Sequence, residues 1–219
     1  MVDKNPKSRF YCWLWPTLIC VTLVITIYVI CCYWPSAVTT VYLVRHAEYD
    51  DIDNESLTSD GLQRAQDLAN LLRSAELDAV YSTEKCRTSQ TAQPTVQENG
   101  LNLYVMKLSG AAVDFNNCLP LIQVQTQVID ASIDHAATIA NHILTNHEGE
   151  VVLVVGHSNT VPRIVSALEA ESLCPDLGPL EDNGECHLPD SQFDNLFIVT
   201  ICGNGNANTV RLRYGEMTP

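Results

Sequence analysis

Short apolar runs alternate with segments of helical character along most of the chain. The runs are rich in β-branched residues, which is typical of buried strands. They lie at residues 41–44, 79–81, 103–106, 151–155, 195–202 and 209–214. Helices are predicted between them, over residues 58–72, 83–97, 130–147 and 161–170. This alternation predicts an α/β fold, a three-layer sandwich with a mainly parallel central sheet flanked by helices and an antiparallel hairpin of the last two strands at one edge.

A longer apolar segment precedes the first strand. Residues 10–34 contain no charged side chain, and this run of 25 is longer than the roughly 20 residues that cross a bilayer. We therefore expect one N-terminal transmembrane helix, acting as an uncleaved signal anchor. A cleaved signal peptide and a lipoprotein at Cys31 or Cys32 are the alternatives, although no Ala-x-Ala site follows the run and Ile30 is large for lipoprotein processing.

The charges around this segment predict its orientation. Three basic residues precede it, and none follows until Arg45, so the positive-inside rule places the N-terminus in the cytoplasm. We expect a cytoplasmic segment at 1–9, the membrane anchor at 10–34, and a folded domain at 35–219 on the extracytoplasmic side, which is the periplasm in a bacterium.

Acidic residues dominate the predicted domain. Beyond residue 34 the chain carries 9 basic and 25 acidic side chains, a net charge of −16. Such a surface repels polyanions, so we expect no nucleic-acid partner. A cationic pocket would be a local exception.

Five cysteines belong to the predicted domain: Cys86, Cys118, Cys174, Cys186 and Cys202. Outside the cytoplasm, disulfides form readily. Because Cys174 and Cys186 bracket one polar loop, their pairing is the favoured disulfide, and two free thiols are equally compatible with the sequence.

Arginine and histidine side chains follow three of the predicted strands or begin the next helix. Arg45-His46-Ala47 ends the first strand, the segment from Ser82 to Ala92 contains Arg87, and Gly156-His157-Ser158 follows the strand at 151–155. Crevices of open α/β sheets lie at such strand ends, so we expect two arginines and two histidines to meet at one sheet edge.

In order and spacing, these three motifs resemble the histidine phosphatase superfamily, the fold shared by cofactor-dependent phosphoglycerate mutases and many phosphatases. The resemblance extends from about Thr39 to Thr200. It implies that His46 attacks phosphorus and becomes phosphohistidine, while Arg45, Arg87 and His157 hold the phosphate. Backbone N–H groups near Ser158, at the start of a helix, would add to the anion site.

The proton donor for the leaving group is less well defined. Many members of the family carry an acid after the third strand or directly after the second histidine, and Ser158 occupies the latter place here. We expect Asp114 to be the acid, with Glu48 as its rival. Both carboxylates are also compatible with a solvated loop position.

The resemblance implies a phosphatase that needs no metal or other cofactor and acts on a small phosphorylated substrate or a phosphoprotein. Together with the predicted anchor, it predicts a membrane-anchored phosphatase. A mutase is one alternative, although the irregular segment 107–129 disfavours it. A catalytically idle domain that binds phosphorylated ligands is the other. A histidine metal site is not favoured, because no acid or cysteine cluster accompanies His135, His142 and His147.

Overall fold

The computed structural model describes residues 19–26, 37–50, 55–108, 112–131, 133–168 and 186–218. The chain divides into two units, Met1–Ser36 and Ala37–Pro219. Residues 19–26 of the first unit are helical. Within the described ranges, no helix is long and apolar enough to cross a membrane. The rest of the predicted span 10–34 lies outside the described residues, so the transmembrane helix stays a prediction.

A seven-stranded sheet forms the middle of the second unit, with the strand order β6-β5-β4-β7-β1-β8-β9. Its strands are β1 (Val38–Arg45), β4 (Ala79–Thr83), β5 (Leu103–Lys107), β6 (Thr126–Asp130), β7 (Val151–Gly156), β8 (Asn195–Cys202) and β9 (Ala207–Arg213). The first five of these in that order pair in parallel, while β8 is antiparallel to both β1 and β9. The predicted mainly parallel sheet with an antiparallel edge hairpin is confirmed.

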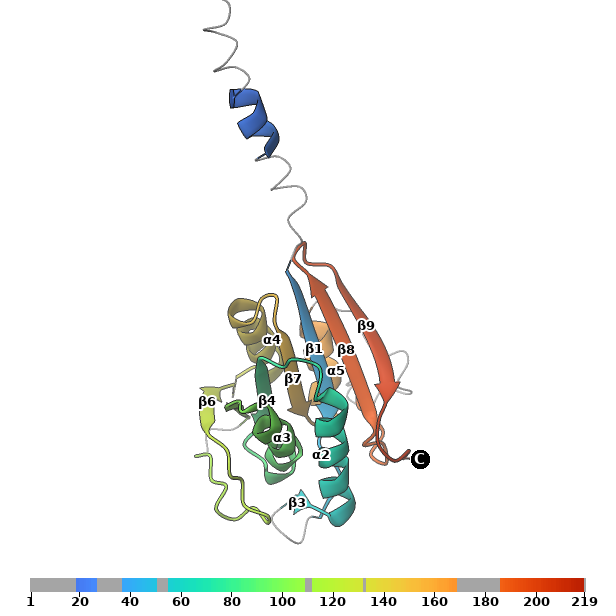
Figure 1. Ribbon diagram of the computed structural model, residues 1–219. Coiled ribbons are helices and arrows are strands. Elements are labelled where there is room, and N and C mark those ends of the chain that lie inside the picture. Colours follow the sequence, from blue (N-terminus) through green and yellow to red (C-terminus); the bar gives the residue numbers. More distant parts are fainter. Residues whose placement is uncertain are drawn as a thin grey trace, which may run out of the picture. The chain divides into compact units, whose positions relative to one another are not determined.

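Two helices cover each face of this sheet (Figure 1). They are α2 (Ser59–Leu72) and α3 (Cys86–Asn99) on one face, and α4 (His135–Asn146) and α5 (Thr160–Ala167) on the other. Alternate strand residues serve the two faces: Val44 packs in the cluster that contains Leu68 and Val96, and Leu43 in the cluster that contains Ile139 and Ile164. The period-2 pattern of the strands therefore builds two cores on one sheet.

Local sequence explains where the helices begin and end. The Thr58 hydroxyl accepts a hydrogen bond from the Gly61 N–H at the start of α2, as the sequence predicts. Asp134 caps α4 in the same way, so this helix begins at His135 and not at residue 130. Pro94 does not end α3, which continues to Asn99.

The parallel register brings the ends of β1 and β7 together. Arg45 pairs with Gly156, and the His46 N–H donates to the Gly156 carbonyl over 2.9 Å. His46 and His157 therefore leave adjacent strands at the same level. A small second sheet, β2 (Tyr49–Asp50) with β3 (Ser56–Leu57), follows His46.

Candidate active site

A cavity of about 500 Å³ lies where β1, β4 and β7 end. All five of the predicted phosphate-site side chains line it: Arg45, His46, Arg87, His157 and Ser158. The three sequence motifs that carry them are far apart along the chain, with 41 positions from His46 to Arg87 and 70 from Arg87 to His157, so the parallel sheet is what makes them neighbours. The structure thus joins the three motifs in one concave site.

His46 is held in the form that a nucleophile needs. The ring is almost completely buried, and its Nδ1 lies 2.8 Å from the Ala47 carbonyl oxygen. Because a carbonyl only accepts, Nδ1 must carry the proton, and Nε2 keeps its lone pair. Burial, helped by the charges of Arg45 and Arg87, lowers the pKa of His46 to about 3. The imidazole is therefore neutral at physiological pH.

Arg45 is fixed by the segment that precedes β8. Its Nη1 donates to the carbonyl oxygens of Pro189 (3.0 Å) and Asp190 (2.9 Å), and its guanidinium lies 4.3 Å from the centre of the Phe193 ring. Its Nε is buried and has no hydrogen-bond partner within the described ranges. A guanidinium held at one end with a free buried N–H is well suited to bind an anion.

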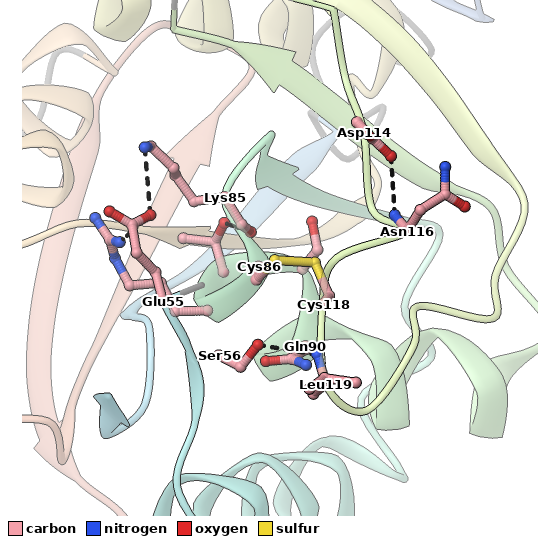
Figure 2. The surroundings of a disulfide bond; sticks show 12 residues. Glu55, Ser56, Lys85, Cys86, Gln90, Asp114, Asn116, Cys118 and Leu119 are labelled. Carbon is pink, nitrogen blue, oxygen red and sulfur yellow. Dashed lines mark hydrogen bonds and ion pairs between the residues drawn. A yellow bond between two sulfur atoms is a disulfide. The ribbon is translucent and has the colours of Figure 1, made fainter. Parts of the chain in front are cut away.

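Arg87, in the first turn of α3, is held by two residues of the loop after His46. Its guanidinium stacks over the Tyr49 ring at 4.6 Å, and its Nη1 lies 2.6 Å from Glu55 Oε2. Lys85 Nζ lies 3.2 Å from the same oxygen (Figure 2). Tyr49 also meets the His46 ring edge-on, 5.0 Å between centres. Nothing in the sequence separates Glu55 from the other acids of its loop. In the structure its backbone is left-handed, with a φ of 59°, which is unusual for a residue with a side chain.

His157 is positioned by Thr83 at the end of β4. Its Nε2 lies 3.0 Å from Thr83 Oγ1, and its ring centre is 5.4 Å from that of His46. Burial, with smaller effects of His46 and Arg87, holds the pKa of His157 well below its usual value. His157 is therefore neutral, and it can offer a hydrogen bond but not a positive charge to a bound phosphate.

The structure does not bring the two expected acids into this cavity. Asp114 is exposed, and its carboxylate accepts a hydrogen bond from the Asn116 N–H over 2.9 Å (Figure 2). The Glu48 carboxylate instead binds the Arg64 guanidinium on α2 at 2.7 to 2.9 Å. Asp190 is the carboxylate that lines the cavity within the described ranges, 3.8 Å from Arg45 Nη2.

A disulfide between Cys86 and Cys118 lies beside Arg87 (Figure 2). It joins the first residue of α3 to the irregular segment between β5 and β6. The predicted pair was Cys174 with Cys186, and Cys174 lies outside the described residues. Sequence spacing gave no signal for Cys86–Cys118, because 32 positions separate the two.

In the described part of the chain, no group of three or more histidine, cysteine, aspartate or glutamate side chains could hold a metal ion. His142 and His147 are instead bonded to Tyr81 and Glu150.

Residues 41–108 match the family model of the histidine phosphatase superfamily, branch 1. This match confirms the resemblance to the histidine phosphatase superfamily. It covers the first two motifs, with His46 and Arg87, and supports phosphatase or phosphoryl-transfer activity. No curated protein sequence matches the chain.

Several solved structures share their fold with most of this chain. A mycobacterial hydrolase 1 superposes with a TM-score of 0.51 at 13% identity, covering 82% of this chain and 99% of its own. A mycobacterial glucosyl-3-phosphoglycerate phosphatase gives 0.50 at 14% identity, covering 81% and 98%. An ecdysone phosphate phosphatase of Bombyx mori in complex with tungstate gives 0.50 at 16% identity, covering 81% and 94%. At these identities the likeness concerns the fold alone.

Proposed function

We propose that this chain is a phosphatase that hydrolyses phosphomonoesters, free or on proteins, through a phosphohistidine at His46. The observation that carries the proposal is a neutral, buried imidazole with a free Nε2 lone pair, in one cavity with Arg45 and Arg87. A neutral nucleophile between two guanidiniums suits attack on a phosphate, because the cations offset the charge of the transferred group. The family match supports the same chemistry.

The reaction has two steps. In the first, His46 Nε2 forms a bond to phosphorus, the bond from phosphorus to the ester oxygen breaks, and that oxygen keeps the electron pair and takes a proton from water. Nδ1 keeps its proton throughout and donates it in a hydrogen bond to the Ala47 carbonyl oxygen. In the second, water attacks phosphorus, the bond from phosphorus to Nε2 breaks, and Nε2 regains its lone pair. The attacking water loses a proton that neutralises the hydroxide left from the first step, and inorganic phosphate leaves. Arg45 and Arg87 bind the equatorial oxygens in both steps.

Turnover by the full-length chain tests the proposal. We expect hydrolysis of p-nitrophenyl phosphate in the presence of EDTA, loss of at least about 10³-fold in kcat for His46→Ala, and little change for His142→Ala, a histidine outside the cavity. Single-turnover trapping should give acid-labile, alkali-stable labelled phosphate on the wild-type chain only. Phosphate binding without turnover would instead identify an idle binding module, and transfer between phosphoglycerate isomers faster than hydrolysis would identify a mutase.

The proposal includes anchoring of this phosphatase in a membrane by residues 10–34, with residues 1–9 in the cytoplasm and residues 35–219 outside it. The uncharged 25-residue run supports the anchor. The Cys86–Cys118 disulfide supports an oxidising compartment for the domain. Alkaline carbonate extraction of membranes, followed by protease digestion of intact cells, tests both parts. Release of the chain by carbonate would refute the anchor, and protection from protease would refute the orientation.

A further inference from the structure

The cavity carries more positive charge than a single phosphate needs. Besides Arg45 and Arg87 it is lined by Lys85 and Arg163, in a chain whose net charge is −14. Its volume of about 500 Å³ is in the range of sites that enclose a small organic ligand. An acidic protein that gathers four cations in one such cavity has a site for a strongly anionic molecule.

Arg163 has no function in the phosphate site described above. It lies in α5, is exposed to solvent, and lines the cavity. No hydrogen bond or ion pair holds its guanidinium in the described part of the chain, whereas Lys85 is paired with Glu55 and Arg45 is fixed by backbone carbonyls. Arg163 is therefore available to a ligand.

His135 is the second side chain that has no partner among the residues that the structure describes. Both of its ring nitrogens are buried, and neither has a hydrogen-bond partner there. Burial lowers the pKa of His135 to about 4; the charge of Arg163 acts in the same direction, and Glu84 acts against it. The imidazole is thus neutral and has one N–H to donate. Buried polar groups normally have partners, so two such nitrogens at the wall of a cavity indicate a ligand.

His135 and Arg163 come to the cavity from α4 and α5, which cover the face of the sheet opposite to α3, the helix that carries Arg87. His135 interacts with His157, whose ring is in contact with that of His46. It also interacts with Arg163. Arg163 and His135 therefore line the cavity from the side of α4 and α5, whereas Arg87 lines it from the side of α3. Glu84, the acid with the largest effect on the pKa of His135, accepts a hydrogen bond from the Leu108 N–H over 2.8 Å.

We propose that the substrate is a small phosphomonoester with a second anionic group, a carboxylate or a second phosphate, which Arg163 and His135 bind while Arg45 and Arg87 hold the reacting phosphate. This inference rests on the proposed phosphatase function, because it assigns the reacting phosphate to the His46 end of the cavity. Arg163 and His135 are then specificity residues that do not touch the reacting atoms.

Matched substrates test this with the full-length chain. We compare ω-phosphooxy carboxylates of two to four carbons with their neutral amides and with bisphosphates of equal length. At the best length we expect kcat/KM for the anionic compound to exceed that of its amide by about 10- to 100-fold, the value of a charged hydrogen bond. The ratio of kcat/KM for the carboxylate to kcat/KM for the bisphosphate of equal length decides which anion is bound.

Substitutions then assign the effect to residues. Arg163→Gln should remove most of the preference for the anionic compound and leave kcat/KM for p-nitrophenyl phosphate within about twofold of the wild-type value. Arg163→Lys should retain part of the preference for the anionic compound. Arg73→Gln, at an exposed position of the other face, is the charge-matched control. Equal kcat/KM for anion and amide at every length, or equal loss for both in Arg163→Gln, would overturn the inference.

A binding measurement separates this inference from the proposed function. Calorimetric titration of His46→Ala with the same pairs requires no turnover. Tighter binding of the anionic compound that depends on Arg163 would support the second site even if the chain does not hydrolyse esters. Hydrolysis of p-nitrophenyl phosphate together with equal binding of anion and amide would leave the phosphatase intact and refute the second site.

Discussion

Removal of the Cys86–Cys118 disulfide should lower the stability of the fold far more than it lowers activity. The bond closes a loop with a sequence separation of 32. In the chain-entropy model such a loop restricts the unfolded chain by about 12 cal/mol/K, which stabilises the folded state by about 4 kcal/mol at 25 °C. For Cys86→Ser with Cys118→Ser we therefore expect the free energy of unfolding to fall by about 3 to 4 kcal/mol.

Urea denaturation of both oxidised wild type and the double variant measures this difference. Mass analysis of the non-reduced peptides first confirms the Cys86–Cys118 bond. Cys202→Ser is the matched control, because Cys202 is a free cysteine of β8, and its effect should stay below about 1 kcal/mol. A difference below about 1 kcal/mol between the oxidised wild type and the double variant would refute the loop-closure argument.

Activity should survive because other contacts hold both partners of the bond. The segment after Cys118 is attached to α3 by the Gln90 side chain, which donates to the Pro120 carbonyl over 2.7 Å. Arg87 keeps its contacts with Tyr49 and Glu55. We expect KM for p-nitrophenyl phosphate to rise less than about threefold. A rise of more than about tenfold would show that the disulfide itself positions Arg87.

Three further changes have defined outcomes. The unfolded His46 ring binds a proton near pH 6.5 and the folded ring only near pH 3, so the free energy of unfolding should fall by about 3 kcal/mol from pH 7 to pH 4. Urea denaturation at several pH values measures this fall, which should be smaller in His46→Ala; an equal fall would contradict the argument. Glu55→Gln should lower KM for p-nitrophenyl phosphate about two- to tenfold, because Glu55 competes with phosphate for Arg87; a higher KM would make Glu55 a positioning residue, and Glu98→Gln is the surface control. Across a series of aryl phosphates, kcat/KM should fall steeply as the leaving-group pKa rises, because neither predicted acid lines the cavity; a flat series would reveal a proton donor, with Asp190→Asn the first variant to test.

Local patterns explain why most of the sheet and the phosphate site could be predicted from the sequence. Val151 to Val155 is a run of β-branched and apolar residues that is buried in β7, and the arginine and histidine motifs directly follow such runs. In contrast, β6 was missed within the segment 107–129 because it is an exposed edge strand without an alternating burial pattern. An edge strand depends on its partner β5 for its conformation, which no local signal reveals.

The remaining site residues depend on distant contacts that a single sequence does not show. Thr83 is one of many hydroxyl residues, and only the pairing of β4 with β7 places it against His157. In the sequence Glu55 is one of several acids in an acidic loop. In the structure its backbone is left-handed and its carboxylate is paired with Arg87. Asp114, chosen for its place along the chain, lies on an exposed loop. Sequence order identifies which motifs meet, but not which side chains of their loops reach the cavity.

The central position of β1 has a consequence for the synthesis of the protein. This strand leaves the ribosome before any of its partners, yet it pairs with β7 on one side and with β8 on the other, so that Val38 lies opposite Cys202. The apolar segment that ends in His46 therefore stays unpaired until β7, more than 100 residues further along the chain, has been made, and contacts between such distant segments form slowly. The nascent chain is prone to aggregation during this time, and His46 takes its place only after β7, whose Gly156 carbonyl accepts the His46 N–H, has been made.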